Sequence, residues 1–233
     1  PDAMPESRRL FERARKVMPG GNTRTTVFIE PFPIYAARGE GCRVWDVDGN
    51  AYYDCINNFT AMIHGYGHPE VTAAVIDQMP HGTAFSAPTE SEIELAELLV
   101  GRLPSVEQIR FANSGTEAVM MAIKAARAFT GRPKIVKIEG AYHGSYDFAE
   151  VSLDSSPANW GDLPASTPYA RGTPRGVLDD VIAVPFNDVE ALRAVFAAHG
   201  EAIAGVLIDP MPNRAGLIPA RKDYLDAMAE VAR

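Results

Sequence analysis

Three residues in the middle of the chain, Ser114, Gly115 and Thr116, have the types and spacing of a phosphate site. We expect them at the carboxyl edge of a sheet, between a strand predicted over 108–111 and a helix predicted over 116–129. The N–H groups of a first helical turn, the helix dipole and two hydroxyls can bind a phosphate monoester there. Gly115 allows the anion to approach the backbone closely. A Ser/Thr helix cap uses the same residue types, so this segment alone leaves both interpretations open.

Tyr142 and His143 form a second candidate, because they follow directly on a strand predicted over 134–138. The carboxyl ends of parallel strands lie at one edge of a sheet, so we expect both residues near the turn at 114–116. The Tyr142 ring could stack on a planar heterocycle whose phosphate binds at that turn. A loop tyrosine that only covers the sheet is equally consistent with the pattern.

A third candidate, a metal site, is weaker. Ligands four residues apart share a face only on a helix, and Gly65 and Gly67 disfavour a helix between two of the histidines. We therefore expect no metal at the group formed by His64, His68, His81 and Cys55.

Helices and strands must position these residues. Apolar residues three and four apart predict helices over 7–18, 70–78, 90–99, 116–129, 189–198 and from Tyr224 to Val231 or Ala232. Short apolar and β-branched runs predict strands over 108–111, 134–138, 181–184 and 203–208. Asn187 and Glu190 have the spacing of a cap for the helix over 189–198. This alternation predicts an α/β fold, a mainly parallel sheet with helices on both faces, which is a three-layer αβα domain.

Two segments depart from that alternation. The runs 42–47 and 51–53 flank Asp48-Gly49-Asn50, a turn typical of a β-hairpin, so the amino-terminal region is predicted as a small α+β region. Residues 153–178 contain four prolines among serines and glycines, and we predict an irregular loop that is either functional or disordered.

Composition excludes several function classes. The 233 residues predict one domain and a fraction, at roughly 150 residues per domain. A net charge of −8 without a basic run is not the pattern of a nucleic-acid-binding protein, so we expect no nucleic-acid partner. There is no apolar stretch near 18 residues, and the 2 cysteines are interpreted as free thiols. We therefore expect no membrane partner and a cytoplasmic location.

An ordered set of motifs resembles the class III family of pyridoxal-phosphate-dependent aminotransferases, in the branch with glutamate-1-semialdehyde aminomutase and the β-amino-acid aminotransferases. The resemblance covers nearly the whole chain. Each motif is weak alone, but their order and spacing are similar to those of the family. They are Pro19 to Arg24, Gly39 to Trp45 with Asp46, Asp48 and Gly49, Asn113 to Ala118, Tyr142-His143-Gly144, and Asp209-Pro210 followed by Gly216.

The resemblance implies a role for each matching residue. Residues 114–116 would hold the phosphate of pyridoxal 5′-phosphate, Tyr142 would stack on its pyridine ring, and His143 would shape the ring pocket. Arg24 would receive the substrate carboxylate, a task suited to a planar bidentate donor. Asp209 would contribute to cofactor binding, although the family usually has a glutamate there, which is one methylene longer.

The resemblance also implies the architecture. It predicts a pyridoxal-phosphate transferase domain of fold type I that is incomplete here. Residues 1–60 would be the amino-terminal segment of a small domain, and 61–233 the first part of the large cofactor-binding domain. The intact protein would be a homodimer acting on a small amino acid and an oxo acid.

The family also has a Schiff-base lysine and an aspartate at the ring nitrogen, both on later strands. None of the lysines here has a suitable place at the sheet edge; they are Lys16, Lys124, Lys134, Lys137 and Lys222. We therefore expect no catalytic residue in this chain, which we interpret as the amino-terminal part of an aminotransferase or aminomutase that does not transaminate alone. The alternative is a non-catalytic relative that binds a phosphorylated ligand. The substrate stays open among α-amino acids, β-amino acids and glutamate semialdehyde.

Overall fold

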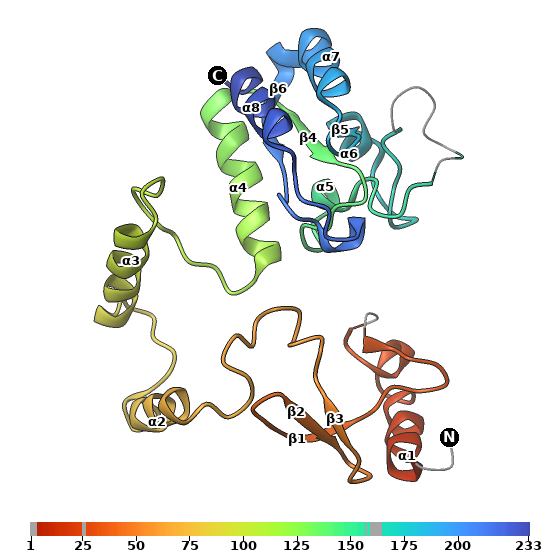
Figure 1. Cartoon of the computed structure of the whole chain (residues 1–233), viewed down its shortest axis with the longest axis vertical. Helices are drawn as coiled ribbons and strands as arrows, with labels where there is room; N and C mark the ends of the chain where they lie inside the picture. Colours follow the sequence, from red (N-terminus) through yellow and green to blue (C-terminus); the bar gives the residue numbers. More distant parts are fainter. Residues whose placement is uncertain (1–3, 25–26, 157, 159–164) are drawn as a thin grey trace. The chain divides into compact units, whose positions relative to one another are not determined.

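A computed structural model describes residues 4–24, 27–156, 158 and 165–233 (Figure 1). The chain divides into two compact units, residues 1–98 and 99–233, and each is described by itself. The predicted domains 1–60 and 61–233 stay a prediction.

The first unit contains a three-stranded antiparallel sheet in the order β1-β2-β3. The predicted hairpin is confirmed by β2 (Arg43–Asp46) and β3 (Ala51–Tyr53), and Gly49 has a φ of 88° in the turn between them. β1 (Ala36–Glu40) was not predicted, because Ala-Ala-Arg-Gly-Glu lacks the β-branched residues that indicate a strand. The backbone of β1 pairs with β2, and the residue types of β1 do not indicate that pairing.

Helix α1 (Pro5–Ala14) differs at both ends from the predicted range 7–18. It begins earlier because Pro5 is well suited to a first helical position. The Asp48 carboxylate lies at this end and accepts hydrogen bonds from the backbone N–H of Glu6 at 2.7 Å and of Ser7 at 3.0 Å. Residues 15–18, predicted as the end of this helix, form turns and a bend instead, and a short 3₁₀ turn, η1 (Pro19–Gly21), follows them.

Two further predicted helices are confirmed with small changes of length. They are α2 (Pro69–Gln78), followed by the 3₁₀ turn η3 (Met79–His81), and α3 (Glu90–Arg102), which crosses the boundary between the two units. The segment 64–68 is not helical, as Gly65 and Gly67 predict.

The second unit is built on a parallel sheet in the order β5-β4-β6, which contains three of the four predicted strands. The strands are β4 (Lys134–Ile138), β5 (Val181–Val184) and β6 (Ile203–Leu207). The helices are α4 (Gly115–Thr130), α5 (Asp147–Glu150), α6 (Arg175–Asp179), α7 (Val189–His199) and α8 (Lys222–Val231), with 3₁₀ turns η5 (Gly200–Ala202) and η6 (Asn213–Ala215).

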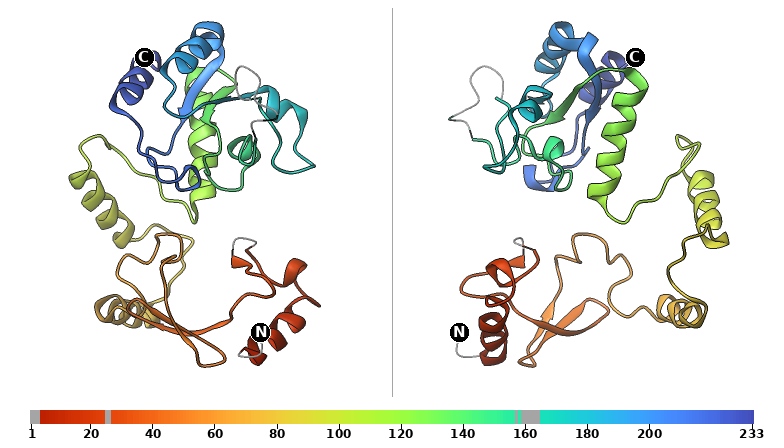
Figure 2. Two further views of the ribbon diagram at one scale, coloured as in Figure 1. Left: turned by 45° about the vertical axis from the view of Figure 1, so that its right-hand side comes forward. Right: turned by 180° about the vertical axis from the view of Figure 1, so that it is seen from behind.

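Alternate residues of β4 point to opposite faces of the sheet, and helices cover both faces. Val136 and Ile138 belong to a buried cluster with Leu192 of α7 and Tyr224 of α8. On the other face α4 packs against β6 (Figure 2). A Cβ at Gly205 would lie 3.8 Å from the Cβ of Ala126 in α4. The predicted α/β, three-layer αβα arrangement is therefore confirmed in this unit.

The strand predicted over 108–111 is wrong. These residues are in neither a strand nor a helix, and Phe111 is exposed. A strand is stabilised by backbone hydrogen bonds to a neighbour, and no such bond to 108–111 is found in the part of the chain that the structure describes. The apolar run alone was not sufficient evidence for a strand.

The predicted cap of α7 is also corrected. Asp188, not Asn187, is the N-cap residue, and its carboxylate accepts a hydrogen bond from the N–H of Ala191 at 2.9 Å. Asn187 has a φ of 62° and instead accepts a hydrogen bond from the N–H of Arg221 at 2.8 Å. Asn and Asp are both typical N-cap residues, but the cap of α7 lies one residue later in the chain than predicted.

The irregular segment predicted over 153–178 is seen in part. Residues 165–174 lie outside helices and strands, and α6 begins at Arg175. Residues 157 and 159–164 of this prediction lie outside the described residues.

Candidate cofactor site

The start of α4 is built as a tight cap. The Ser114 hydroxyl accepts a hydrogen bond from the N–H of Glu117 at 3.2 Å, and the Glu117 carboxylate accepts one from the N–H of Asn113 at 2.8 Å. Ser114 is therefore a helix cap, which was one of the two open interpretations. The helix itself offers no carbonyl to the N–H groups of Gly115 and Thr116, so these two donors remain suited to an anion.

Thr116 joins this turn to the loop after β4. Its Oγ1 accepts a hydrogen bond from the N–H of Ser145 at 3.1 Å. Gly144 has a φ of 89°, and a Cβ there would lie 2.5 Å from Thr116 Oγ1 and 2.8 Å from its Cα, so no larger residue fits without a shift. The structure thus brings together the two segments that the sequence singled out, at 114–116 and 142–144.

Tyr142 lies in this loop with 48% of its surface exposed. An aromatic ring exposed to this degree has a face that a planar ligand can cover. The predicted stacking role is consistent with this exposure and stays a prediction.

His143, the next residue, is shielded from solvent to a greater degree. Its Nε2 is buried and has no hydrogen-bond partner among the described residues. The pKa of His143 is lowered to about 4, first by burial and then by the Lys137 charge, while the Asp209 charge opposes both effects. The imidazole is therefore neutral at pH 7, with one buried nitrogen available to a ligand.

Asp209 follows β6 at the same edge of the sheet. One carboxylate oxygen accepts a hydrogen bond from the N–H of Met211 at 2.9 Å. Its electrostatic effect on His143 places its charge in the surroundings of that imidazole.

Lys137 is a residue whose importance the sequence analysis missed. It is completely buried in β4, and burial lowers its pKa to about 8, against the opposing effect of Glu139. A signal was present in the sequence, because a lysine between Val136 and Ile138 in a strand with both faces covered has to be buried.

Arg24 belongs to the first unit, so the structure does not place it relative to the residues of the second. Its guanidinium donates a hydrogen bond to the Asn58 side chain at 3.1 Å and lies 5.7 Å from the centre of the Phe59 ring. The segment 57–60, which contacts the Arg24 side chain, has an unusual backbone, because all four residues have positive φ angles. Such a run costs conformational energy in non-glycine residues and occurs at functional sites.

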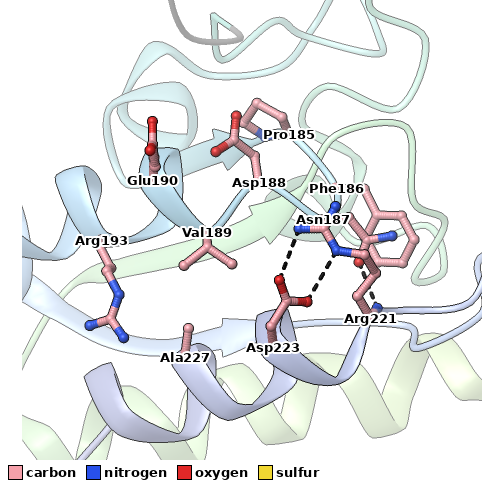
Figure 3. A pocket seen from close by; sticks show the side chains of 10 residues that line it. All are labelled: Pro185, Phe186, Asn187, Asp188, Val189, Glu190, Arg193, Arg221, Asp223 and Ala227. Atoms are coloured by element: carbon pink, nitrogen blue, oxygen red, sulfur yellow. Dashed lines mark hydrogen bonds and ion pairs between the residues drawn. The ribbon is translucent and has the colours of Figure 1, made fainter.

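A separate hollow of about 770 Å³ lies beside α7 and α8 (Figure 3). Several of its polar groups are engaged with each other or with α7, since Arg221 pairs with Asp223 at 3.1 Å and Asp188 caps α7. It contains none of the predicted site residues. Its lining residues are Pro185, Phe186, Asn187, Asp188, Val189, Glu190, Arg193, Arg221, Asp223 and Ala227.

The described residues contain no group of three or more His, Cys, Asp or Glu side chains arranged to hold a metal ion. Their helices include none that combines the length and the apolar character needed to span a membrane.

Comparisons with known proteins agree on one family. The aminotransferase class-III family matches residues 27–233. An omega-transaminase from Sphaerobacter thermophilus is 55% identical, with a TM-score of 0.95, over 98% of this chain and 52% of that chain. A transaminase with PLP bound is 47% identical, with a TM-score of 0.92 and the same coverage.

A curated relative, glutamate-1-semialdehyde 2,1-aminomutase from Aeropyrum pernix, is 41% identical over 98% of this chain and 52% of its own length. The chain thus spans about half the length of the curated relatives it matches.

Proposed function

The chain belongs to the class-III aminotransferase family, and on that premise we propose that it forms the phosphate-binding and ring-binding part of a pyridoxal-phosphate-dependent aminotransferase or aminomutase. The observation that carries this proposal is the contact between the start of α4 and the loop after β4, through Thr116, Gly144 and Ser145. That contact supports a phosphate site and a ring site next to each other.

The residues fit a planar phosphorylated cofactor. Pyridoxal 5′-phosphate is the cofactor of the family, and when bound it supplies an electron sink for the substrate's reacting carbon. The two backbone donors of α4 bind the phosphate. The Thr116 hydroxyl already accepts a hydrogen bond from Ser145, so its own proton is left to donate to a phosphate oxygen. Tyr142 orients the ring by stacking, and neutral His143 offers its unpartnered Nε2 at the ring's edge.

The covalent part of the chemistry is proposed to need a lysine outside these residues. Lys137 donates hydrogen bonds to three backbone carbonyls, and Lys222 forms an ion pair with Asp226 at 2.6 Å. Lys134 donates a hydrogen bond to the carbonyl of Asp179, Lys124 is exposed in the middle of α4, and Lys16 is exposed in the turn after α1. These contacts support our proposal that no lysine of this chain bonds to the cofactor and that the chain alone does not transaminate.

For the intact protein we propose transamination ahead of isomerisation, because the identity to the omega-transaminase, 55%, exceeds the 41% to the aminomutase. The substrate carries a carboxylate, which Arg24 receives. A homodimer and a cytoplasmic location stay predictions.

The proposal is tested by replacing one hydroxyl. Thr116→Val removes the proposed donor to the phosphate, and we expect pyridoxal phosphate to bind about tenfold more weakly or worse, as for the loss of a hydrogen bond to a charged group. The measurement is a fluorescence titration with pyridoxal phosphate and, in parallel, with pyridoxal, which lacks the phosphate.

Thr130→Val, at the other end of α4, is the matched control, since the Thr130 hydroxyl bonds only within its own helix and the turn after it. We expect it to bind like the wild type. Equal affinities of both variants, or equal affinities of the wild type for pyridoxal phosphate and pyridoxal, would contradict the proposal.

A further inference from the structure

The ammonium group of Lys137 lies in the interior of the fold, out of contact with solvent. The residue has no exposed surface and lies in the central strand of the sheet. Its Nζ donates hydrogen bonds to the carbonyl oxygens of Val151 at 2.7 Å, Ala141 at 3.2 Å and Ile138 at 3.2 Å. An ammonium has three protons, so these three acceptors use its full capacity.

The three carbonyls bracket one segment. Ile138 is the last residue of β4, Ala141 directly precedes Tyr142, and Val151 directly follows α5. The ammonium therefore connects the beginning and the end of residues 139–150. A backbone hydrogen bond from the N–H of Gly140 to the carbonyl of Ser152, at 2.8 Å, runs parallel to this connection.

The same segment carries the contact to α4 and the residues proposed to meet the ring. Burying a charge here costs desolvation free energy, and an apolar side chain would pack in this position without that cost. The carbonyls of Ala141 and Val151 explain the cation, because buried polar groups need a hydrogen-bond donor. The Ile138 carbonyl also accepts a hydrogen bond from the N–H of Ala141 at 3.3 Å.

We propose that Lys137 is a positioning residue, whose buried ammonium holds residues 139–150 in the conformation that presents Tyr142 and His143 to the cofactor. This inference rests on the proposed function, since it assumes that the ring binds at these two residues. Lys137 itself does not touch the cofactor.

The variant that tests this proposal is Lys137→Met, whose unbranched side chain is one heavy atom shorter and lacks the charge and the donors. The first measurement is hydrogen exchange by mass spectrometry on the chain without cofactor. We expect exchange in 139–150 to accelerate about tenfold or more, while peptides from α7 and α8 stay as in the wild type. Lys124→Met, at an exposed position of α4, is the control and should change neither region.

The second measurement is the affinity for pyridoxal phosphate, which Lys137→Met should weaken at least as much as Thr116→Val does. Lys137→Arg keeps a buried cation with several donors, and we expect it to restore part of the affinity and of the protection. Wild-type exchange in 139–150 together with wild-type affinity in Lys137→Met would overturn the proposal.

If Lys137→Met does not fold, the wild type provides the test. The lowered pKa of Lys137 means that a change from pH 7 to 9.5 removes its charge and one of its three donors. The ionisable groups that interact with it are Glu139 and His143, and Glu150 of α5 and Asp209 after β6 are the further charged groups of this region; His143 is neutral at both pH values. We expect exchange in 139–150, corrected for its intrinsic pH dependence, to rise relative to α7. An equal change in both regions would overturn the proposal.

The two failures can be told apart. If the wild type does not bind pyridoxal phosphate, the proposed function fails, while the exchange of 139–150 in Lys137→Met still decides whether the lysine holds the loop. If the wild type binds the cofactor but Lys137→Met keeps both its affinity and its protection, only the role of Lys137 is refuted.

Discussion

At the scale of single residues, the site depends on charges around one neutral imidazole. His143 is half-buried; the charge of Lys137 disfavours a protonated ring, and the charge of Asp209 favours it. The sequence predicted Tyr142, His143 and Asp209 as site residues, but it did not predict this balance. Burial of Lys137 depends on the whole sheet being covered, and no local pattern states that directly.

The balance gives a prediction for Asp209→Asn. The Asp209 charge stabilises the imidazolium, so its removal should lower the pKa of His143 below the wild-type value of about 4, whereas Lys137→Met should raise it. An NMR titration of the His143 ring proton measures both shifts.

In the wild type the stability due to neutral His143 is complete above the ordinary pKa of 6.5 and is lost as the pH falls toward about 4. A wild-type pKa near 6.5, or shifts of the same sign in both variants, would be inconsistent with the arrangement described here.

At the scale of elements, local signals succeeded where an element carries its own pattern. The helices α4 and α7 and the strands β4, β5 and β6 have apolar spacing that packing then uses. The strand predicted over 108–111 and the missed β1 show the limit, because a strand needs a partner that its own residues do not specify. The N-cap of α7 moved from Asn187 to Asp188 because both residue types cap helices and only the backbone path decides between them.

One interaction between elements leads to a prediction about α1. Burial raises the pKa of Asp48, but the hydrogen bonds from Glu6 and Ser7 outweigh it, so the net pKa is lowered. Asp48→Ala removes the acceptor for two N–H groups of the first helical turn, and we expect trypsin to cleave at the arginines of α1 several-fold faster, as for a helix that has lost its N-terminal cap.

Asp77→Asn, on exposed α2, is the control for this comparison, and trypsin should cleave it as fast as the wild type. In the wild type the contribution of Asp48 is complete above its ordinary pKa of 3.8 and is lost as the pH falls through the lowered value. Unchanged cleavage of Asp48→Ala at pH 7 would show that the carboxylate does not anchor this helix.

At the scale of the whole molecule, the residues proposed to bind the phosphate and the ring lie in the second unit, and the arginine proposed to bind the substrate carboxylate lies in the first. The sequence, through its family resemblance, predicted that Arg24 and residues 114–116 serve one site. Composition and spacing alone could not relate them, because residues so far apart in the chain are connected only by tertiary structure.

The most direct test of this account is a crystal structure of the chain with pyridoxal phosphate. We predict the phosphate within about 3 Å of the N–H groups of Gly115 and Thr116, the usual hydrogen-bond distance, and the ring against Tyr142. The cofactor aldehyde should be bonded to no lysine of the chain. A phosphate bound in the hollow beside α7 and α8, or a covalent bond from the cofactor to one of the five lysines, would contradict it.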